Sequence, residues 1–359
     1  MHKLMKTTTF DALGVMSGTS LDGIDLAYVQ FEQQKTWRYK LLQCSTVPYP
    51  KFWQEKLSHL PEKPLESLQQ LDVAYTAYLG EVIVQFCLKH QLPPSVFISS
   101  HGHTALHQPA EGVTYQLGNL KSLATATGRT VVCDFRTQDV AQGGQGAPLV
   151  PVGDKLLFST YAACLNLGGF ANVSINTSKG IKAFDIAAVN TVLNSFAQQL
   201  GQPYDNGGTI AKSGQNIPEL SEALQAISFY HNPPPKSLGV EWVQATLAPL
   251  FNQFSTAAVP DVLHTYTQHI AAVIGDALPR SGAVLVTGGG AFNSYLMHCI
   301  QQHTTAEIVV PSKELISFKE AVVFAFLGVL QRLEIPNCLA EVTGAEQDHV
   351  SGKIFFPSK

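Results

Sequence analysis

Three glycine-containing turns carry residue types that bind phosphate groups. The first, residues 17–25, reads Ser-Gly-Thr-Ser-Leu-Asp-Gly-Ile-Asp, and the others contain Gly168-Gly169 and residues 288–290. None is a P-loop, and the third lacks the dinucleotide fingerprint because Asn293 stands where its last glycine belongs. Backbone N–H groups of a tight glycine turn can converge on one anion without a helix. The turns therefore predict either phosphate-binding sites or ordinary β-hairpins.

Carboxylates and one arginine accompany these turns. Asp22 and Asp25 would repel a phosphate chain unless a cation lay between them, so Mg²⁺ is one interpretation of the first turn. Asp185 is expected at a strand end before a helix, as a catalytic group or as a helix N-cap. Arg136 follows a predicted strand and could bind a carboxylate or phosphate, or form a structural ion pair.

Histidines and cysteines give weaker signals. The spacing His-x-His-x-x-x-His at residues 101–107 allows metal ligation, but a polar loop lining a cleft explains it equally. The six cysteines are scattered without a Cys-x-x-Cys pair, which is typical of small buried hydrophobic residues in a reducing compartment and not of a disulfide framework or a zinc site.

Composition excludes several classes of function. A formal net charge of −4 and the lack of a basic run argue against nucleic-acid binding. The longest apolar run, residues 321–330, is about half of the ~20 residues that span a membrane, and residues 1–10 hold no signal-peptide core. We therefore expect a soluble, cytoplasmic protein without a membrane partner.

The elements that position these residues alternate between strands and helices. Strands are expected at residues 10–16, 25–31, 96–99, 130–134, 164–167, 171–175 and 283–287. One further strand is expected to end at residue 185. Helices are expected at residues 65–92, 120–128, 189–200, 218–229, 260–278 and 320–333. This alternation predicts an α/β fold.

The chain is long enough for two domains. The glycine- and proline-rich segment near residues 140–151 is the expected boundary, which gives domains 1–140 and 141–359. A strand, a glycine turn and a second strand open each of these parts, so we expect two related halves.

Taken together, the segments resemble one family, the anhydro-N-acetylmuramic acid kinases, from about residue 11 to the C-terminus. The most specific segments are Gly-Val-Met-Ser-Gly-Thr-Ser-Leu-Asp-Gly-Ile-Asp at residues 14–25 and Gly-Gly-Gln-Gly-Ala-Pro-Leu-Val at 143–150. Further matches are Ser-His-Gly-His-Thr at 100–104, Asp-Phe-Arg at 134–136, Asn-Leu-Gly-Gly-Phe-Ala-Asn at 166–172, the spaced Tyr-Asp, Gly, Ala and Gly residues of 204–214, Gly-Gly-Gly-Ala-Phe-Asn at 288–293, Glu-Ala at 320–321 and Val-Thr-Gly-Ala at 342–345.

The resemblance implies two actin-like (ribonuclease H-like) domains with ATP in the interdomain cleft, usually in a homodimer. It also implies the reaction: water opens the 1,6-anhydro bond of the murein sugar while the freed O6 takes the γ-phosphate of ATP. The product is N-acetylmuramic acid 6-phosphate, within peptidoglycan recycling. ATP and Mg²⁺ are the implied cosubstrate and cofactor.

The resemblance also assigns roles to residues. Asp185 matches the family's catalytic aspartate, although residues 184–190 read Phe-Asp-Ile-Ala-Ala-Val-Asn where the family commonly has Phe-Asp-Thr-Gly-Pro-Gly-Asn. Arg136 is the candidate for the lactyl carboxylate, and Glu320 for a second substrate contact. The nucleotide would be bound by Gly18, Thr19, Ser20, Leu21, Asp22, Gly23, Ile24, Asp25, Gly168, Gly169, Gly288, Gly289 and Asn293. Asp22 and Asp25 are the candidates for Mg²⁺, with Asp205 also in view.

Three interpretations remain beside one another on the sequence alone. The first is the murein-sugar kinase itself. The second is a kinase of a simpler anhydrosugar such as levoglucosan, which has neither an N-acetyl nor a lactyl group. The third is a non-catalytic actin-like ATPase homologue, suggested by the altered residues 186–189.

Overall fold

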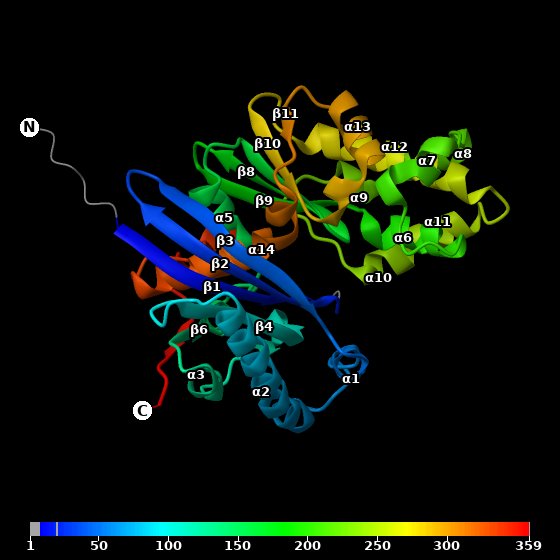
Figure 1. Ribbon diagram of the computed structural model, residues 1–359. Helices are drawn as coiled ribbons and strands as arrows, with labels where there is room; N and C mark the ends of the chain where they lie inside the picture. Colours follow the sequence, from blue (N-terminus) through cyan, green and yellow to red (C-terminus); the bar gives the residue numbers. More distant parts are fainter. Residues whose placement is uncertain (1–7, 19–20, 359) are drawn as a thin grey trace, which may run out of the picture. The chain divides into compact units, whose positions relative to one another are not determined.

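The computed structural model describes residues 8–18 and 21–358 (Figure 1). The chain divides into two compact units: Met1–Leu157 with Phe318–Lys359, and Phe158–Ser317. This division differs from the expected boundary at residue 140. The glycine-rich loop is held inside the first unit, where the Gln145 N–H donates to the carbonyl of Thr343 over 2.7 Å. The C-terminal segment returns to the same unit.

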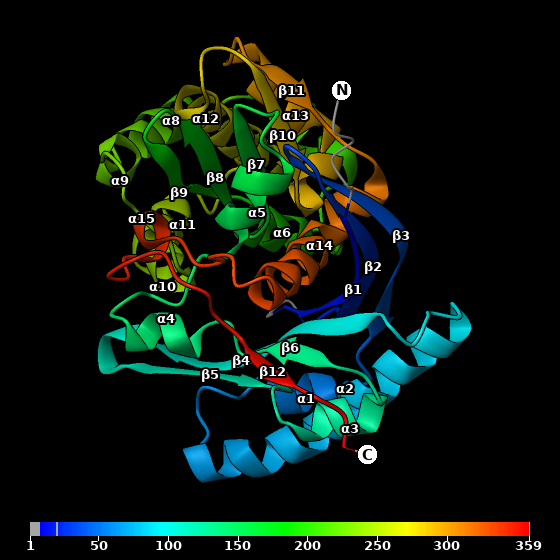
Figure 2. The same cartoon turned by 90° about the vertical axis from the view of Figure 1, so that its left-hand side faces the viewer.

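A seven-stranded sheet forms the first unit, in the order β12-β6-β4-β1-β2-β3, with β5 paired to β4. Strands β1 to β3 are antiparallel neighbours, and β1, β4 and β6 run parallel. In Figure 2 the red C-terminal strand β12 lies beside β6, its antiparallel partner. The strands are β1 (Thr8–Ser17), β2 (Gly23–Gln33), β3 (Trp37–Pro48), β4 (Phe97–Gln108), β5 (Val113–Leu117), β6 (Val131–Cys133) and β12 (Lys353–Phe355).

A five-stranded sheet forms the second unit, in the order β11-β10-β7-β8-β9. Strands β7 to β9 are antiparallel neighbours, whereas β7, β10 and β11 run parallel. The strands are β7 (Ala163–Leu167), β8 (Phe170–Thr177), β9 (Gly180–Ala188), β10 (Ala283–Thr287) and β11 (Glu307–Val309).

The central strands of the two sheets share one topology. In each sheet, three consecutive antiparallel strands form one side, and two parallel strands continue it from the first of the three. This is the strand order of a ribonuclease H-like domain, so the expected α/β class with two related actin-like units is confirmed. The equivalent hairpins are β1–β2 and β7–β8, the pairs that the two glycine turns connect.

Helices cover both sheets. The first unit contains α1 (Lys51–Leu57), α2 (Leu65–Lys89), α3 (Ser122–Thr127), α4 (Thr137–Ala141), α5 (Val150–Leu157) and α15 (Ala340–Thr343). The second contains α6 (Asn190–Gln199), α7 (Thr209–Ser213), α8 (Pro218–Gln225), α9 (Ser228–His231), α10 (Val240–Trp242), α11 (Ala248–Asn252), α12 (Val259–Ala277) and α13 (Ser294–Gln302). Helix α14 (Lys313–Arg332) begins in the second unit along the chain and ends in the first.

The apolar part of α14 is a core helix of the first unit. All its hydrophobic side chains from Ala321 to Leu330 are at most 1% exposed. Gly14 of β1 permits this packing, because a Cβ at residue 14 would lie 1.9 Å from the carbonyl oxygen of Ala321. A helix buried on all sides shows no polar face, which explains the continuous apolar run in the sequence.

In the described part of the chain, α2 alone has the length and hydropathy of a membrane span, and half of its most apolar window is buried in the protein. Its side chains Leu68, Tyr75 and Leu79 are fully buried in the first unit's hydrophobic core. A core helix of a globular protein meets the same criteria of length and composition.

Candidate active site

The first turn connects β1 and β2, which pair in register up to Ser17 opposite Ile24. Leu21 has a φ of +60°, in the left-handed region, and its N–H donates to the carbonyl of Gly18 over 3.4 Å. Thr19 and Ser20 lie outside the described residues. Ile24 is fully buried in the core, so only its main chain could contact a nucleotide.

The fold itself requires a glycine at position 23, independently of any ligand. A Cβ at this position would lie 2.4 Å from the carbonyl oxygen of Val47. Strand β3, which pairs with β2 here, therefore leaves room for hydrogen only. The two carboxylates of the turn differ in surroundings: Asp22 is exposed, and Asp25 is half-buried and accepts a 2.5 Å hydrogen bond from Thr46 Oγ1.

The first unit brings Asp25, Arg136 and Glu320 into one electrostatic group. Burial raises the pKa of the Asp25 carboxyl, and the charge of Asp22 adds to that increase. Desolvation of the carboxyl raises the pKa of Glu320, although part of this side chain is exposed. Arg136 opposes that rise and Asp25 adds to it. Two neighbouring carboxylates whose ionisation is disfavoured are suited to a cation or to a hydroxyl-rich ligand.

Arg136 is held by two acceptors. Its Nε donates to His101 Nε2 over 2.9 Å, and its Nη1 donates to the carbonyl of Gly146 over 2.6 Å. His101 Nδ1 in turn donates to the Gly102 carbonyl over 2.9 Å, and burial lowers the pKa of the ring well below its usual value. Among the described residues no hydrogen bond to a protein acceptor involves Nη2, so the N–H groups of Nη2 remain available to an anion.

The other two histidines of the sequence cluster have separate partners. His103 Nδ1 lies 2.7 Å from Ser17 Oγ, which is also 2.6 Å from the hydroxyl of Tyr49. Burial lowers the pKa of His103 to about 4. His107 Nδ1 lies 3.3 Å from Thr114 Oγ1. The three rings do not form a metal-binding group in the described part of the chain. The residue pattern did not predict this polar chain beneath the first turn.

The second turn caps a helix. The carbonyl of Gly169 accepts from Val189 N–H over 2.8 Å and from Thr191 N–H over 3.2 Å, and the Gly168 carbonyl accepts from Asn190 N–H over 3.2 Å. These N–H groups belong to the first turn of α6 and the residue before it. A Cβ at Gly169 would lie 2.7 Å from Thr191 Oγ1, so the turn must approach α6 without a side chain.

The third turn lies beside the second. Strands β7 and β10 are parallel, with Asn166 opposite Thr287, so Gly168 and Gly288 follow neighbouring carboxyl ends. A Cβ at Gly288 would lie 2.6 Å from Asn166 Oδ1. Ligands of open α/β sheets bind at such carboxyl ends. Two of the three segments that were predicted to bind the nucleotide therefore lie next to each other.

Two further polar residues of this unit are explained by local structure. Asn293 is the N-cap of α13, where its Oδ1 accepts from Leu296 N–H over 3.0 Å. Unlike Gly288, the next glycine of the third turn, Gly289, has room for a Cβ, whose nearest neighbour would be Asn190 Nδ2 at 3.7 Å. Asp205 accepts from Ile210 and Ala211 N–H groups at 2.8 and 2.9 Å, so both its oxygens cap α7.

Asp185 lies inside a strand and not at its end. Strand β9 continues to Ala188, and Val189 is the N-cap residue of α6, so the expected strand end and the alternative N-cap role at Asp185 are both wrong. Residues 186–189 lack the glycines and proline that would end the strand earlier. Asp185 is half-buried, and its Oδ2 accepts from Leu238 N–H over 2.8 Å. Burial raises the pKa of the carboxyl, and the bond from Leu238 lowers it.

A cavity of about 680 Å³ lies beside β9. Phe184 and Ile186, the neighbours of Asp185 in the strand, line it together with Tyr230, Lys236 and His269. The pairing of β8 with β9 shifts register at this point, between Ala171 and Asn172, and Asp185 is not among the lining residues. The predicted catalytic residue does not line this cavity.

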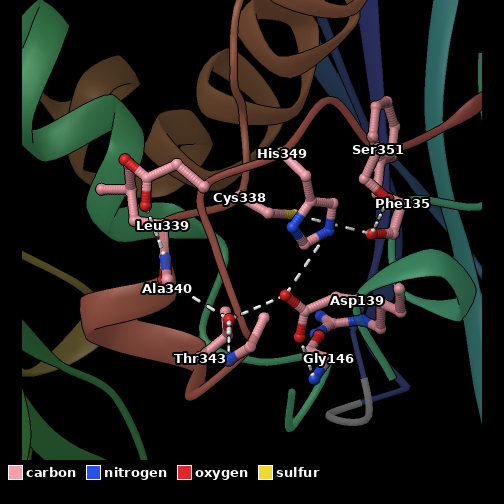
Figure 3. A network of polar contacts seen from close by, with 12 residues as sticks. Phe135, Asp139, Gly146, Cys338, Leu339, Ala340, Thr343, His349 and Ser351 are labelled. Carbon is pink, nitrogen blue, oxygen red and sulfur yellow. Dashed lines mark hydrogen bonds and ion pairs between the residues drawn. The ribbon is translucent and has the colours of Figure 1, made fainter. Parts of the chain in front are cut away.

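Asp139 of α4 is a further buried carboxylate that the residue pattern did not single out. Its Oδ2 accepts from Gly146 N–H over 2.7 Å, and its Oδ1 accepts from Thr343 Oγ1 over 2.7 Å (Figure 3). A Cβ at Gly144 would lie 2.2 Å from Oδ2. The glycine-rich loop thus wraps around one buried carboxylate, a role that the spacing from Arg136 to the loop did not reveal.

Comparison with known proteins identifies the relatives of this chain. The family model described as anhydro-N-acetylmuramic acid kinase matches residues 11–357. The anhydro-N-acetylmuramic acid kinase of Pseudomonas putida is 36% identical, over 96% of this chain and 98% of that protein. The enzyme of the same name from Saccharophagus degradans is 33% identical, over 98% of this chain and 100% of that protein.

A solved xylulose kinase from Lactobacillus acidophilus shares 10% identity and a TM-score of 0.44, over 97% of this chain and 94% of that one. The family model matches nearly the whole chain, and the two relatives named above do so at 36% and 33% identity. The chain therefore belongs to the anhydro-N-acetylmuramic acid kinase family.

Proposed function

We propose that this protein is an ATP-dependent kinase that opens the 1,6-anhydro ring of 1,6-anhydro-N-acetylmuramic acid and phosphorylates O6. The product is N-acetylmuramic acid 6-phosphate, an intermediate of peptidoglycan recycling. The observation that carries this proposal is the family match across residues 11–357, in a chain that retains an aspartate at the position of the family's base.

In the proposed reaction, Asp185 accepts a proton from water as the water oxygen bonds to C1 of the sugar. The bond from C1 to O6 breaks, and O6 forms a bond to the γ-phosphorus of ATP while ADP leaves. The proton then passes from Asp185 to solvent. A half-buried carboxylate with a raised pKa is a stronger base than an exposed one, which supports this role.

Arg136 is the proposed ligand of the lactyl carboxylate. Its guanidinium is fixed by His101 and Gly146, and Nη2 remains for a carboxylate. Glu320 would accept hydrogen bonds from sugar hydroxyls. The glycine turns at residues 18–25, 168–169 and 288–289 are the proposed nucleotide-binding segments, through main-chain N–H groups.

Mg²⁺ fits the carboxylates of the first unit. The charge of Asp25 raises the free-energy cost of ionising Glu320, and a hard divalent cation near Asp25 would relieve that repulsion through oxygen ligands. Asp25 is the main candidate and Asp22 an auxiliary one. When bound, Mg²⁺ neutralises charge on the transferred phosphoryl group. We further propose a homodimer in the cytoplasm, where ATP is available.

Mass measurement tests the reaction. The purified protein is incubated with ATP, Mg²⁺ and 1,6-anhydro-N-acetylmuramic acid, and we expect a product heavier by one water and one phosphoryl group. Levoglucosan serves as the control substrate. Equal turnover of both sugars would contradict the murein assignment. ATP hydrolysis without sugar modification would favour an ATPase homologue.

A further inference from the structure

A buried cluster of three metal-ligand types lies in the first unit and contains none of the residues that the proposed reaction uses. Asp139 of α4 meets Cys338 and His349 of the C-terminal segment, and their ligand atoms all lie within 4.8 Å of one another. Their exposed fractions are 0%, 2% and 7%. Figure 3 shows the three side chains turned toward one another.

Backbone pairing fixes two of the three side chains. Cys338 and His349 form an isolated antiparallel bridge, in which each N–H donates to the other's carbonyl over 3.1 Å. Residues opposite each other in such a pair project their side chains to the same face. The Asp139 carboxylate is fixed independently, by Thr343 Oγ1 and by Gly146 N–H at 2.7 Å each. All three groups are therefore positioned before any ligand binds.

The ring of His349 lies between two oxygen acceptors. Its Nδ1 is 3.0 Å from the carbonyl oxygen of Gln347, so Nδ1 carries the proton and donates. Its Nε2 then presents a lone pair to Asp139 Oδ1 at 3.6 Å, and no hydrogen bond satisfies this buried nitrogen within the described part of the chain. A second proton or a cation at Nε2 would replace the repulsion between this lone pair and the carboxylate oxygen with an attraction.

The sulfur of Cys338 favours the cation. A doubly protonated imidazole would pair with Asp139 alone, and the Cys338 thiol would keep the Phe135 carbonyl, 3.9 Å away, as its acceptor. Cysteine, histidine and aspartate together are instead a typical ligand set of Zn²⁺, whereas Mg²⁺ and Ca²⁺ prefer oxygen alone. A histidine whose other nitrogen donates to a backbone carbonyl is also the usual arrangement around a bound metal.

We propose that Asp139, Cys338 and His349 supply three of the four ligands of one Zn²⁺ ion, through a carboxylate oxygen, Sγ and Nε2, and that a water molecule is the fourth ligand. As the metal–sulfur bond forms, the thiol proton of Cys338 passes to solvent. The ion would tie the C-terminal segment to the glycine-rich loop. Because Gly146 of that loop accepts a hydrogen bond from Arg136 Nη1, zinc would also stabilise the proposed substrate arginine.

Calorimetry on the full-length protein tests this site. The chelator-treated, dialysed protein is titrated with Zn²⁺, and its thermal unfolding is followed with and without the ion. We expect one ion per chain and a higher Tm with zinc. Both effects should be lost in Cys338→Ser and in His349→Gln. Thr343→Val, which removes the donor to Asp139, should weaken binding about 10- to 100-fold.

Matched controls separate this site from adventitious binding. Cys87→Ser removes another buried cysteine of the first unit, and His298→Gln removes an exposed histidine. Both should bind zinc as the unchanged chain does. Circular dichroism of each variant shows whether it has folded.

Cobalt substitution of the unchanged chain gives a result that needs no variant. We expect an intense thiolate-to-cobalt charge-transfer absorption from Cys338. Lack of stoichiometric binding, a cobalt spectrum without this absorption, or equal binding by folded Cys338→Ser and His349→Gln would each overturn the proposal.

Discussion

The main-chain N–H of Leu238 donates a 2.8 Å hydrogen bond to Oδ2 of Asp185. The main-chain N–H of Asp185 donates in turn to the carbonyl of Lys236 over 3.0 Å. The segment 236–238 therefore fixes one oxygen of the carboxylate. Among the described residues no such bond occupies Oδ1, so this oxygen remains available for the proposed proton transfer from water.

Asp185→Asn should abolish sugar turnover and leave nucleotide binding nearly unchanged. The amide keeps the shape of the side chain but does not accept a proton, and loss of a general base lowers rates by about 10²- to 10⁴-fold. Steady-state kinetics measures turnover, and calorimetry with a non-hydrolysable ATP analogue measures affinity. If the affinity for the analogue collapses as well, Asp185 is a nucleotide-binding or structural residue.

Activity should fall on the acid side through the titration of Asp185. A base works when deprotonated, and burial raises the pKa of this carboxyl above its ordinary value. Below that pKa, kcat should fall about tenfold for each pH unit. Circular dichroism at each pH excludes unfolding as the cause. An identical acid limb in the residual activity of Asp185→Asn would assign the titration to another group.

Arg136→Lys should raise KM for 1,6-anhydro-N-acetylmuramic acid without raising KM for ATP. The lysine ammonium group cannot replace the planar guanidinium group that His101 and Gly146 hold in place. A charge-assisted hydrogen bond contributes about 1.5–3 kcal/mol, or about 10- to 150-fold in affinity. Levoglucosan has no carboxylate and serves as the matched substrate. A proportional loss with levoglucosan would mean that Arg136 acts through the structure of the loop.

Asp25→Asn should impair the use of Mg²⁺ and ATP more than Asp22→Asn does. Asp25 is half-buried and interacts electrostatically with Glu320, whereas Asp22 is exposed. The measurement is the Mg²⁺ concentration that gives half-maximal velocity at saturating sugar. Unchanged kinetics in both variants would remove the metal site from the first turn.

Gly14→Ala should destabilise the protein by about 1–3 kcal/mol, a typical cost of overpacking a core. The new methyl group would lie 1.9 Å from the carbonyl oxygen of Ala321, so β1 and α14 would have to move apart. Urea unfolding measures the change. For stability alone, the matched control is Gly289→Ala, whose nearest contact would be an ordinary 3.7 Å. Equal stability of the two variants would contradict this account of Gly14.

Local patterns in the sequence predict much of the fold. Alternating apolar residues and glycine turns predict the hairpins β1–β2 and β7–β8, and helical periodicity predicts α2 and α12. These signals depend on neighbours within a few residues, so the sequence contains them directly. Strand β3 was missed because it is an edge strand whose side chains alternate weakly between apolar and polar.

Long-range contacts decided the remainder. Only the folded chain brings α14 against Gly14, places Asp185 inside β9, and joins Asp139 to two residues about 200 positions later. The scattered cysteines gave no local zinc-binding spacing, and the proposed zinc site depends on contacts between distant segments. The physical reason is that burial and pairing between distant segments leave no local periodicity, so sequence patterns predict the elements but not which side chains meet.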